Sequence, residues 1–172
     1  MKRHLLLVGL PGSGKSTVGK LVADHLAAPF IEPDAVIVRK MQMPVARIFG
    51  MVGEPTFREM ERQAVESALA GSPAVIAPGA GWAAQPGQLD GALTRACVIY
   101  LKVMIGTAAK RVGDGESRPL LAGSDPVEAI RGLLKEREPF YQRAELEVKC
   151  DIKTAEQVAE EIVTLAHNNA GW

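Results

Sequence analysis

The stretch that decides the fold is Gly9–Thr17, which reads GLPGSGKST. It fits the P-loop pattern G-x-x-x-x-G-K-[S/T] in full, and it joins an apolar run, Leu5–Val8, to an amphipathic helical stretch, Lys15–Ala27. Glycines let the backbone turn with its N–H groups directed at an anion, and the positive end of the helix dipole adds to this attraction. The segment therefore predicts a site for the phosphates of a nucleoside triphosphate.

The side chains of this loop have separate expected parts. Lys15 should reach the β- and γ-phosphates, and the Ser16 hydroxyl should bind Mg²⁺. The other residues expected to contact the nucleotide are Gly12, Ser13, Gly14 and Thr17. The motif is specific for phosphate binding, but it says little about the reaction.

Short apolar runs alternate with helical stretches along the rest of the chain. We expect strands at Leu5–Val8, Pro29–Ile31, Ala74–Ala77, Ala96–Leu101 and Glu147–Cys150. We expect helices at Lys15–Ala27, Val36–Phe49 with a disturbance at Pro44, Thr56–Ala70, Thr107–Val112, Pro126–Tyr141 with Asp125 as its cap, and Ala155–Ala166, followed by a frayed tail at His167–Trp172. Because helices separate the strands, the pattern predicts an α/β fold, a three-layer α/β/α sandwich with a five-stranded parallel sheet, of the kind found in P-loop NTPases and nucleoside-monophosphate kinases.

The composition bounds the class of protein. The 172 residues are 47% apolar, which suits a single domain over residues 1–172. Twenty basic and 20 acidic residues give no net charge, which argues against nucleic acid or an anionic membrane as a partner. No run approaches the roughly 20 apolar residues of a membrane span. Cys97 and Cys150 stand apart, each in an apolar run, so we expect reduced thiols in a cytoplasmic protein. We also expect the protein to be a monomer.

Charged side chains follow the expected strands and helices where a parallel sheet would gather them. Glu32 and Asp34 come directly after the second strand, so one could act through Mg²⁺ while the other binds an acceptor hydroxyl; taken alone, they could equally be solvated loop carboxylates. Arg58 lies in the first turn of a helix with Glu61 one turn later on the same side. Arg137 lies late on another helix. Each arginine alone could be an ordinary surface residue.

Two loops complete the set. Gly79–Gly81 is a turn of small residues after the third strand, where a backbone can approach a ligand closely. The segment Gly113–Asp125 is rich in Gly, Asp, Ser and Pro, and it is expected to be a mobile loop carrying the cation Arg118.

Taken together, these pieces resemble the shikimate kinase family, and the match runs from Leu5 to about Ala166. The family pattern is, in order, a P-loop followed by T-x-G, then D-x-D, G-E-x-x-F-R-x-x-E, G-G-G, a lid R-P-L-L, and R-x-x-x-Y. The corresponding segments here are Lys15–Gly19, Glu32–Asp34, Gly53–Glu61, Gly79–Gly81, Arg118–Leu121 and Arg137–Tyr141. Both their order and their spacing fit.

The resemblance implies an ATP-dependent enzyme of aromatic amino-acid biosynthesis that phosphorylates the 3-hydroxyl of shikimate. In that case Asp34 would orient and deprotonate the hydroxyl, and Arg58 and Arg137 would grip the shikimate carboxylate beside the Gly79–Gly81 turn. Arg118 would close with the lid and neutralise charge on the transferring group. Lys15, Asp34 and Arg118 would be the catalytic residues.

The resemblance also implies further ligand contacts. Arg111 would stack on adenine, and the turn containing Lys153 would cover the other side of the base. Mg²⁺ would be held at Ser16 and Glu32. The lid would span about 112–125 and the acceptor-binding helices about 33–71.

Two positions depart from the family pattern, and two further residues flank one of them. Glu32 stands for the first Asp of D-x-D, Ala80 for the middle glycine of the triplet, and Pro78 and Trp82 flank that triplet. If the middle position needs a positive φ or open space, Ala80 would crowd the pocket. These departures leave open a kinase of another hydroxylated acid, such as gluconate, and a catalytically weak nucleotide-binding protein. An adenylate-kinase-like activity would need more cations for a second nucleotide than the sequence offers.

Overall fold

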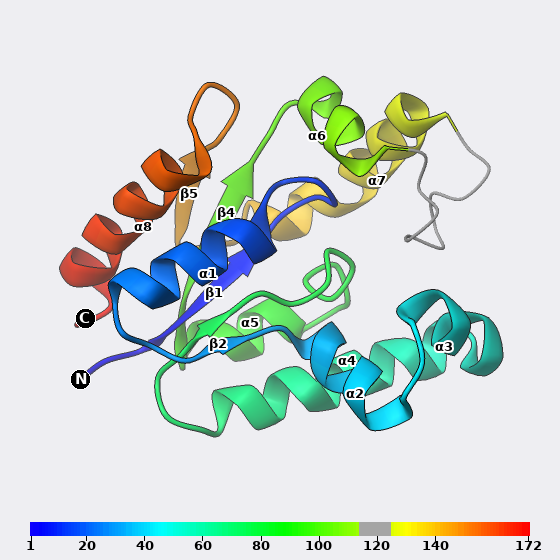
Figure 1. Cartoon of the computed structure of the whole chain (residues 1–172), viewed down its shortest axis with the longest axis horizontal. Helices are drawn as coiled ribbons and strands as arrows, with labels where there is room; N and C mark the ends of the chain where they lie inside the picture. Colours follow the sequence, from blue (N-terminus) through cyan, green and yellow to red (C-terminus); the bar gives the residue numbers. More distant parts are fainter. Residues whose placement is uncertain (114–124) are drawn as a thin grey trace.

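The computed structural model describes residues 1–113 and 125–172 as five parallel strands with helices on both faces (Figure 1). The strand order is β2-β3-β1-β4-β5. The strands are β1 (His4–Val8), β2 (Phe30–Ile31), β3 (Val75–Ile76), β4 (Ala96–Lys102) and β5 (Leu146–Lys149). The predicted α/β class and five-stranded parallel sheet are confirmed.

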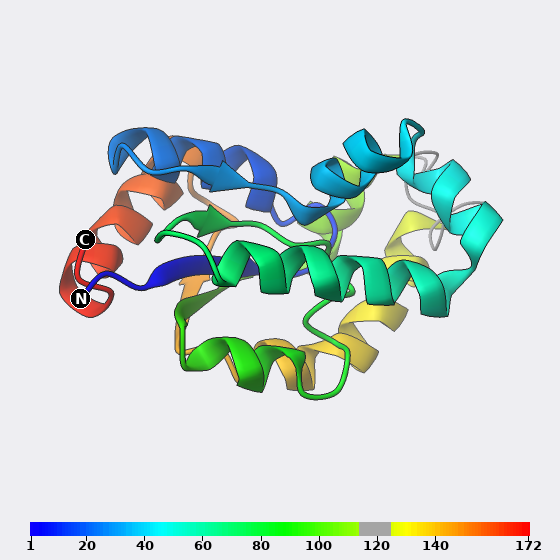
Figure 2. The same ribbon diagram turned by 90° about the horizontal axis from the view of Figure 1, so that it is seen from below.

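The helices form the two outer layers. They are α1 (Lys15–His25), α2 (Pro33–Met41), α3 (Val45–Val52), α4 (Glu54–Leu69), α5 (Gln88–Leu93), α6 (Ile105–Val112), α7 (Pro126–Tyr141) and α8 (Ala155–Asn169). Figure 2 shows α1 and α8 on one side of the sheet and α5 and α7 on the other. Right-handed crossovers between parallel strands place α4 with the second group.

The central strand explains the order of the sheet. All five residues of β1 are buried, as expected for an unbroken apolar strand covered on both faces. Leu5 pairs with Val75 on one side, and Leu6 pairs with Val98 on the other. The carboxyl end of β1 therefore lies between the ends of β3 and β4, and the P-loop leaves the sheet at its centre.

The region expected to be helical at Val36–Phe49, with a disturbance at Pro44, is divided at that point into two helices, α2 and α3. Gln42 ends α2 in the left-handed conformation, with φ of 54°, and Pro44 is the cap before α3. Proline lacks the N–H that a continuous helix would need at this point. The short helix α5 was not predicted at all, and its six residues give too few turns for a periodic signal.

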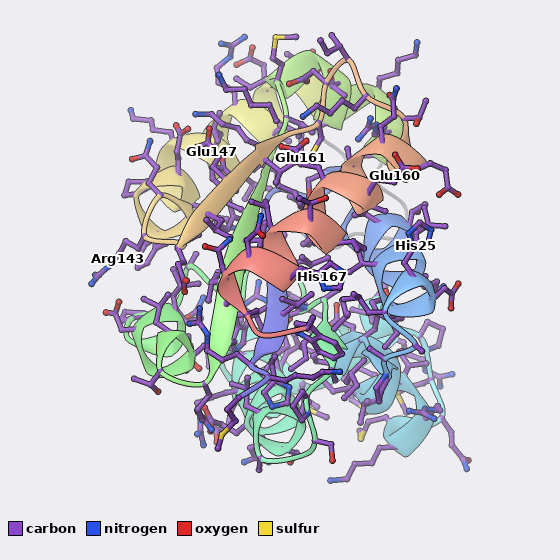
Figure 3. All side chains as sticks on the ribbon, turned by 90° about the vertical axis from the view of Figure 1, so that its left-hand side faces the viewer. His25, Arg143, Glu147, Glu160, Glu161 and His167 are labelled. Carbon is purple, nitrogen blue, oxygen red and sulfur yellow. The ribbon has the colours of Figure 1, made fainter. Side chains whose placement is uncertain are left out.

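The frayed tail expected at His167–Trp172 is wrong. The helix α8 continues to Asn169, and the Trp172 indole Nε1 donates a hydrogen bond of 2.9 Å to the Arg3 carbonyl. The His167 ring contacts the Trp172 carbonyl oxygen at 2.7 Å. Figure 3 shows α8 beside α1 at this end of the molecule, with His25 and His167 labelled.

The helix α7 matches its prediction at both ends. The Asp125 side chain accepts a hydrogen bond of 2.9 Å from the Val127 N–H, and the helix passes through Pro139 to Tyr141. The predicted mobile loop before it lies almost entirely outside the described residues. Within them, no helix is long and apolar enough to cross a membrane.

A second, smaller apolar cluster lies apart from the main core. It consists of Ile37, Ile48 and Phe57, which come from α2, α3 and α4. In Figure 1 these helices project from the sheet on the side opposite the two chain ends. They form one wall of the site described next.

Candidate active site

A pocket with a volume of about 610 Å³ opens at the carboxyl ends of the strands. The P-loop forms one side, and α2–α4, the turn after β3 and α7 form the other. Predicted site residues that line it are Gly12, Gly14, Lys15, Ser16, Thr17, Glu32, Asp34, Arg58, Gly79, Ala80, Gly81, Arg111 and Arg137. Parallel α/β sheets place ligands at this edge.

The P-loop has the backbone that its sequence requires. Gly12 has φ of 79°, and a Cβ added there would lie 2.6 Å from the Ala108 carbonyl oxygen. The Lys15 Nζ donates hydrogen bonds to the carbonyls of Gly9 at 2.9 Å and Leu10 at 2.8 Å. The ammonium thus lies at the mouth of the loop, where a phosphate would meet both it and the N–H groups that begin α1.

Ser16 and Glu32 bring together the oxygens expected to hold a metal ion. The Ser16 hydroxyl donates a hydrogen bond to the Glu32 carboxylate, and both side chains line the pocket. The extra methylene of Glu32 therefore does not remove it from the P-loop. Hydroxyl and carboxylate oxygens are the donors that Mg²⁺ prefers, so the residues present fit this ion.

On the acceptor side, two carboxyl groups and a guanidinium form a buried cluster. The Arg58 Nη1 lies 2.5 Å from the Glu61 Oε2, and its Nη2 lies 3.5 Å from the Glu54 Oε1. Glu61 is almost fully buried. Burial, and then the charge of Asp34, raise the pKa of Glu61 to about 7. Burial also raises the pKa of Asp34, against the opposing effects of a hydrogen bond with Glu61 and the charge of Arg58. The cluster can hold a proton close to neutral pH.

Arg137 contrasts with Arg58 in its pairing. Arg137 is only 7% exposed and lines the pocket from α7. Within residues 1–113 and 125–172, no acidic side chain forms an ion pair with it, whereas Arg58 pairs with two. A buried guanidinium is costly unless a counter-ion compensates it, so Arg137 is well suited to receive an anionic ligand.

The turn at Gly79–Gly81 packs against this cluster. A Cβ at Gly79 would overlap the Glu61 Oε1, and one at Gly81 would lie 2.5 Å from the Arg58 Nη2. Ala80 is different, because its φ is not positive. Its carbonyl accepts a hydrogen bond of 2.7 Å from the Tyr141 hydroxyl. Residue 80 therefore does not meet the condition of a positive φ under which an alanine would be strained there.

Some expected site residues lie elsewhere. Ser13 is buried behind the loop, where its hydroxyl accepts a hydrogen bond of 3.3 Å from Lys15. Lys153 does not line this pocket, and its ammonium pairs with Glu161 on α8. Arg111 donates a 3.3 Å bond to the Gly12 carbonyl, so it lies beside the P-loop. Arg118 lies outside the described residues.

Several pocket residues were missed from the sequence. Glu61 was noticed beside Arg58 but was not assigned to the site, although its spacing of three residues was the available signal. Tyr141, the last residue of the Arg137–Tyr141 segment, does not line the pocket but contacts its wall through the Ala80 carbonyl. An apolar wall of Val45, Phe49, Phe57 and Leu133 also lines the pocket, and such residues cannot be told from core residues in a sequence.

A P-loop that faces a buried pocket of carboxyl and guanidinium groups defines a P-loop kinase of small molecules. The shikimate kinase family model matches residues 11–167. The chain therefore belongs to the shikimate kinase family, and its class as an ATP-dependent phosphotransferase, predicted from the sequence, is confirmed.

Relatives and solved structures agree with this assignment. A shikimate kinase of Mycobacterium avium is 42% identical over 144 residues, which are 84% of this chain and 81% of the relative. One from Moorella thermoacetica is 39% identical over 94% of this chain and 93% of the relative. The Acinetobacter baumannii shikimate kinase in complex with shikimate superposes with a TM-score of 0.93 at 30% identity, covering 98% of this chain and 95% of that one. A gluconokinase of Sinorhizobium meliloti, at 19% identity and a TM-score of 0.64, shows the shared fold alone.

Proposed function

We propose that this chain transfers the γ-phosphoryl group of ATP to the 3-hydroxyl of shikimate, giving shikimate 3-phosphate and ADP. Family membership and the similarity to a kinase solved with shikimate support this reaction. The observation that carries the acceptor assignment is Arg137, a buried guanidinium that lines the pocket without an acid partner in the described part of the chain. A carboxylate on the acceptor supplies that partner through charge-assisted hydrogen bonds.

On the acceptor side, Arg58 and Arg137 hold the carboxylate of shikimate while Asp34 orients its 3-hydroxyl. Asp34 accepts the hydroxyl proton as the oxygen attacks the γ-phosphorus. A carboxyl group whose pKa burial raises is a better proton acceptor than one in water. The turn at Gly79–Gly81 closes this side of the pocket.

On the donor side, the P-loop N–H groups and Lys15 hold the phosphates in this proposal, and Arg111 stacks on adenine; its hydrogen bond to the Gly12 carbonyl supports a place beside the nucleotide. When bound at Ser16 and Glu32, Mg²⁺ neutralises phosphate charge. Arg118 neutralising the transferring group and Lys153 covering the base remain predictions. The same holds for the single-domain organisation, the lid at about 112–125, and a cytoplasmic monomer without nucleic-acid or membrane partners.

The reaction is tested by coupled measurement of ADP release with Mg²⁺ and ATP. We expect turnover that depends on shikimate and is at least about a hundredfold lower in kcat/KM with gluconate, a difference of about 2.7 kcal/mol. Arg137→Met should raise the KM for shikimate and leave that for ATP unchanged. Arg131→Met, on the exposed side of the same helix, is the matched control. Turnover without any dependence on shikimate would overturn the proposal.

A further inference from the structure

Tyr141 makes a contact that the proposed chemistry does not use. It lies in the last turn of α7, its side chain is fully buried, and its hydroxyl donates a hydrogen bond of 2.7 Å to the carbonyl of Ala80. The two residues are 61 positions apart in the chain. This bond connects α7, which carries Arg137, to the Gly79–Gly81 turn. The side chains of Asp34, Glu61 and Arg58 lie against the same turn.

Tyr141 is also a neighbour of Arg137 on α7. The two residues are four apart on α7, so their side chains lie on one face of the helix. Burial raises the pKa of Tyr141 to about 12, and the charge of Arg137 and a side-chain hydrogen bond with it act in the opposite direction. The phenol thus donates its hydrogen bond to the turn while it lies close enough to the Arg137 guanidinium for that charge to act on its pKa.

The turn needs such an anchor because its neighbours are charged and closely packed. Gly79 lies against Glu61 and Asp34, and Gly81 lies against the Arg58 guanidinium. A rotation of the peptide between these glycines would move the backbone relative to these charged groups. Holding the carbonyl of residue 80 prevents that rotation, and it does so whether the side chain is hydrogen or methyl.

We propose that Tyr141 is a positioning residue for the acceptor: its hydroxyl sets the orientation of Arg137 and of the Gly79–Gly81 turn together, so that both match the bound hydroxy acid. This inference rests on the proposed function for the identity of the acceptor. It goes beyond that function by assigning a role to a side chain that touches neither substrate. The bond is made by the carbonyl of residue 80, so it can form with Ala80 as well as with the glycine of the family pattern.

Tyr100 supplies a matched control. Its ring lies 5.2 Å from that of Tyr141, and its hydroxyl is buried without a hydrogen-bond partner among the described residues. Tyr141→Phe and Tyr100→Phe therefore each remove one buried hydroxyl at the same place in the core. Only the first removes a bond to the acceptor side.

The test compares kcat and the KM values for shikimate and ATP in the two variants, with melting temperatures as a folding check. We expect Tyr141→Phe to raise the KM for shikimate about tenfold, which corresponds to about 1.4 kcal/mol, and to change the KM for ATP less than about twofold. Tyr100→Phe should change neither. An unchanged KM for shikimate in Tyr141→Phe, or an equal rise for both substrates, would overturn the proposal.

A second measurement does not depend on turnover. Amide hydrogen exchange at Gly81 and Trp82, whose N–H bonds to the Gly79 carbonyl at 3.0 Å, should become faster in Tyr141→Phe and stay unchanged in Tyr100→Phe. If the wild type lacks shikimate-dependent turnover, the proposed function fails, and this exchange result alone decides whether Tyr141 holds the turn. Equal exchange in all three proteins would contradict the anchoring role.

Discussion

The three residues of the turn at Gly79–Gly81 differ in how much room each has. At Gly79 a methyl group would overlap the Glu61 carboxyl and come within 3.0 Å of the Asp34 Oδ2. Gly79→Ala should therefore displace both carboxyl groups and raise the KM for shikimate at least about tenfold, with little change for ATP. Steady-state kinetics with each substrate varied in turn measures this split.

The control for this prediction is Ala80→Gly, which restores the glycine of the family pattern. Because the recorded hydrogen bond of residue 80 is made by its carbonyl, this change should alter the KM for shikimate less than about threefold, or about 0.7 kcal/mol. A larger effect at residue 80 than at Gly79 would contradict the close packing described for the turn.

Glu61 makes the stability of the protein depend on pH. Its pKa is raised from 4.5 to about 7, so between these values the folded state binds a proton that the unfolded state has released. Stability from this group is fully present below pH 4.5 and is lost as the pH rises through 7. Relative to Glu61→Gln, the free energy of unfolding of the wild type should fall by about 1–3 kcal/mol between pH 5 and pH 8.

Urea titrations at several pH values measure this difference. Glu66→Gln is the control, since Glu66 lies on the same helix but its side chain is 42% exposed. It should not change the slope of stability against pH. The same slope in Glu61→Gln as in the wild type would show that Glu61 does not hold the proton.

At the scale of elements, α8 carries a complete capping box. The Thr154 hydroxyl accepts from the Gln157 N–H at 3.2 Å, and the Gln157 side chain accepts from the Thr154 N–H at 2.9 Å. Thr154→Ala removes the hydroxyl that accepts from the Gln157 N–H at the start of the helix. We therefore expect a loss of about 1 kcal/mol in the free energy of unfolding. Thermal or urea unfolding measures it.

Thr164 offers the comparison within the same helix. Its hydroxyl bonds back to the Glu160 carbonyl at 3.1 Å in the middle of α8, where threonine has a lower helix propensity than alanine. Thr164→Ala should therefore leave stability unchanged or slightly higher. An equal loss of stability in Thr154→Ala and Thr164→Ala would mean that the capping hydrogen bond of Thr154 does not stabilise the helix.

Elements with a clear apolar period could be predicted from the sequence, whereas the details of their interruptions could not. The strand expected at Ala96–Leu101 is observed at Ala96–Lys102, and the helix expected from Pro126 begins there. The break between α2 and α3 depends on a left-handed Gln42, and the ordered tail depends on Trp172 reaching Arg3. Pro44 indicated the break between the helices, but the left-handed turn at Gln42 and the contact of Trp172 with Arg3 are not visible in local propensity.

The same division applies to the site. Asp34 could be placed at the site because parallel strands bring their following loops to one edge, whereas Arg58 and Arg137 were assigned to it by the family resemblance. The bond from Tyr141 to Ala80 could not, since it depends on how α7 lies across the turn after β3. The spacing of Arg58 and Glu61 did indicate that this pair could form. Nothing in the sequence showed that Arg137 forms no ion pair with an acidic side chain in the described chain.

At the scale of the whole molecule, the helices α2, α3 and α4, which form the acceptor wall of the pocket, have their own small core. Ile37, Ile48 and Phe57 pack together apart from the main cluster around the sheet. A unit held by few buried apolar residues opens at lower free energy than the central strands. We therefore expect amides of α2 and α3 to exchange at least about tenfold faster than those of β1 and β4.

Ligands should separate the two parts further. In the proposed complex, shikimate contacts Asp34 on α2, Arg58 on α4 and Arg137 on α7. Its binding should therefore slow exchange in α2 and the first turn of α4. Nucleotide alone should slow exchange in the P-loop and α1 but leave α2 and α3 unchanged, because no P-loop residue belongs to the small core. If α2 and α3 exchange as slowly as β1 and β4 without ligand, the molecule opens as one unit, and the acceptor wall cannot respond to shikimate separately from the sheet.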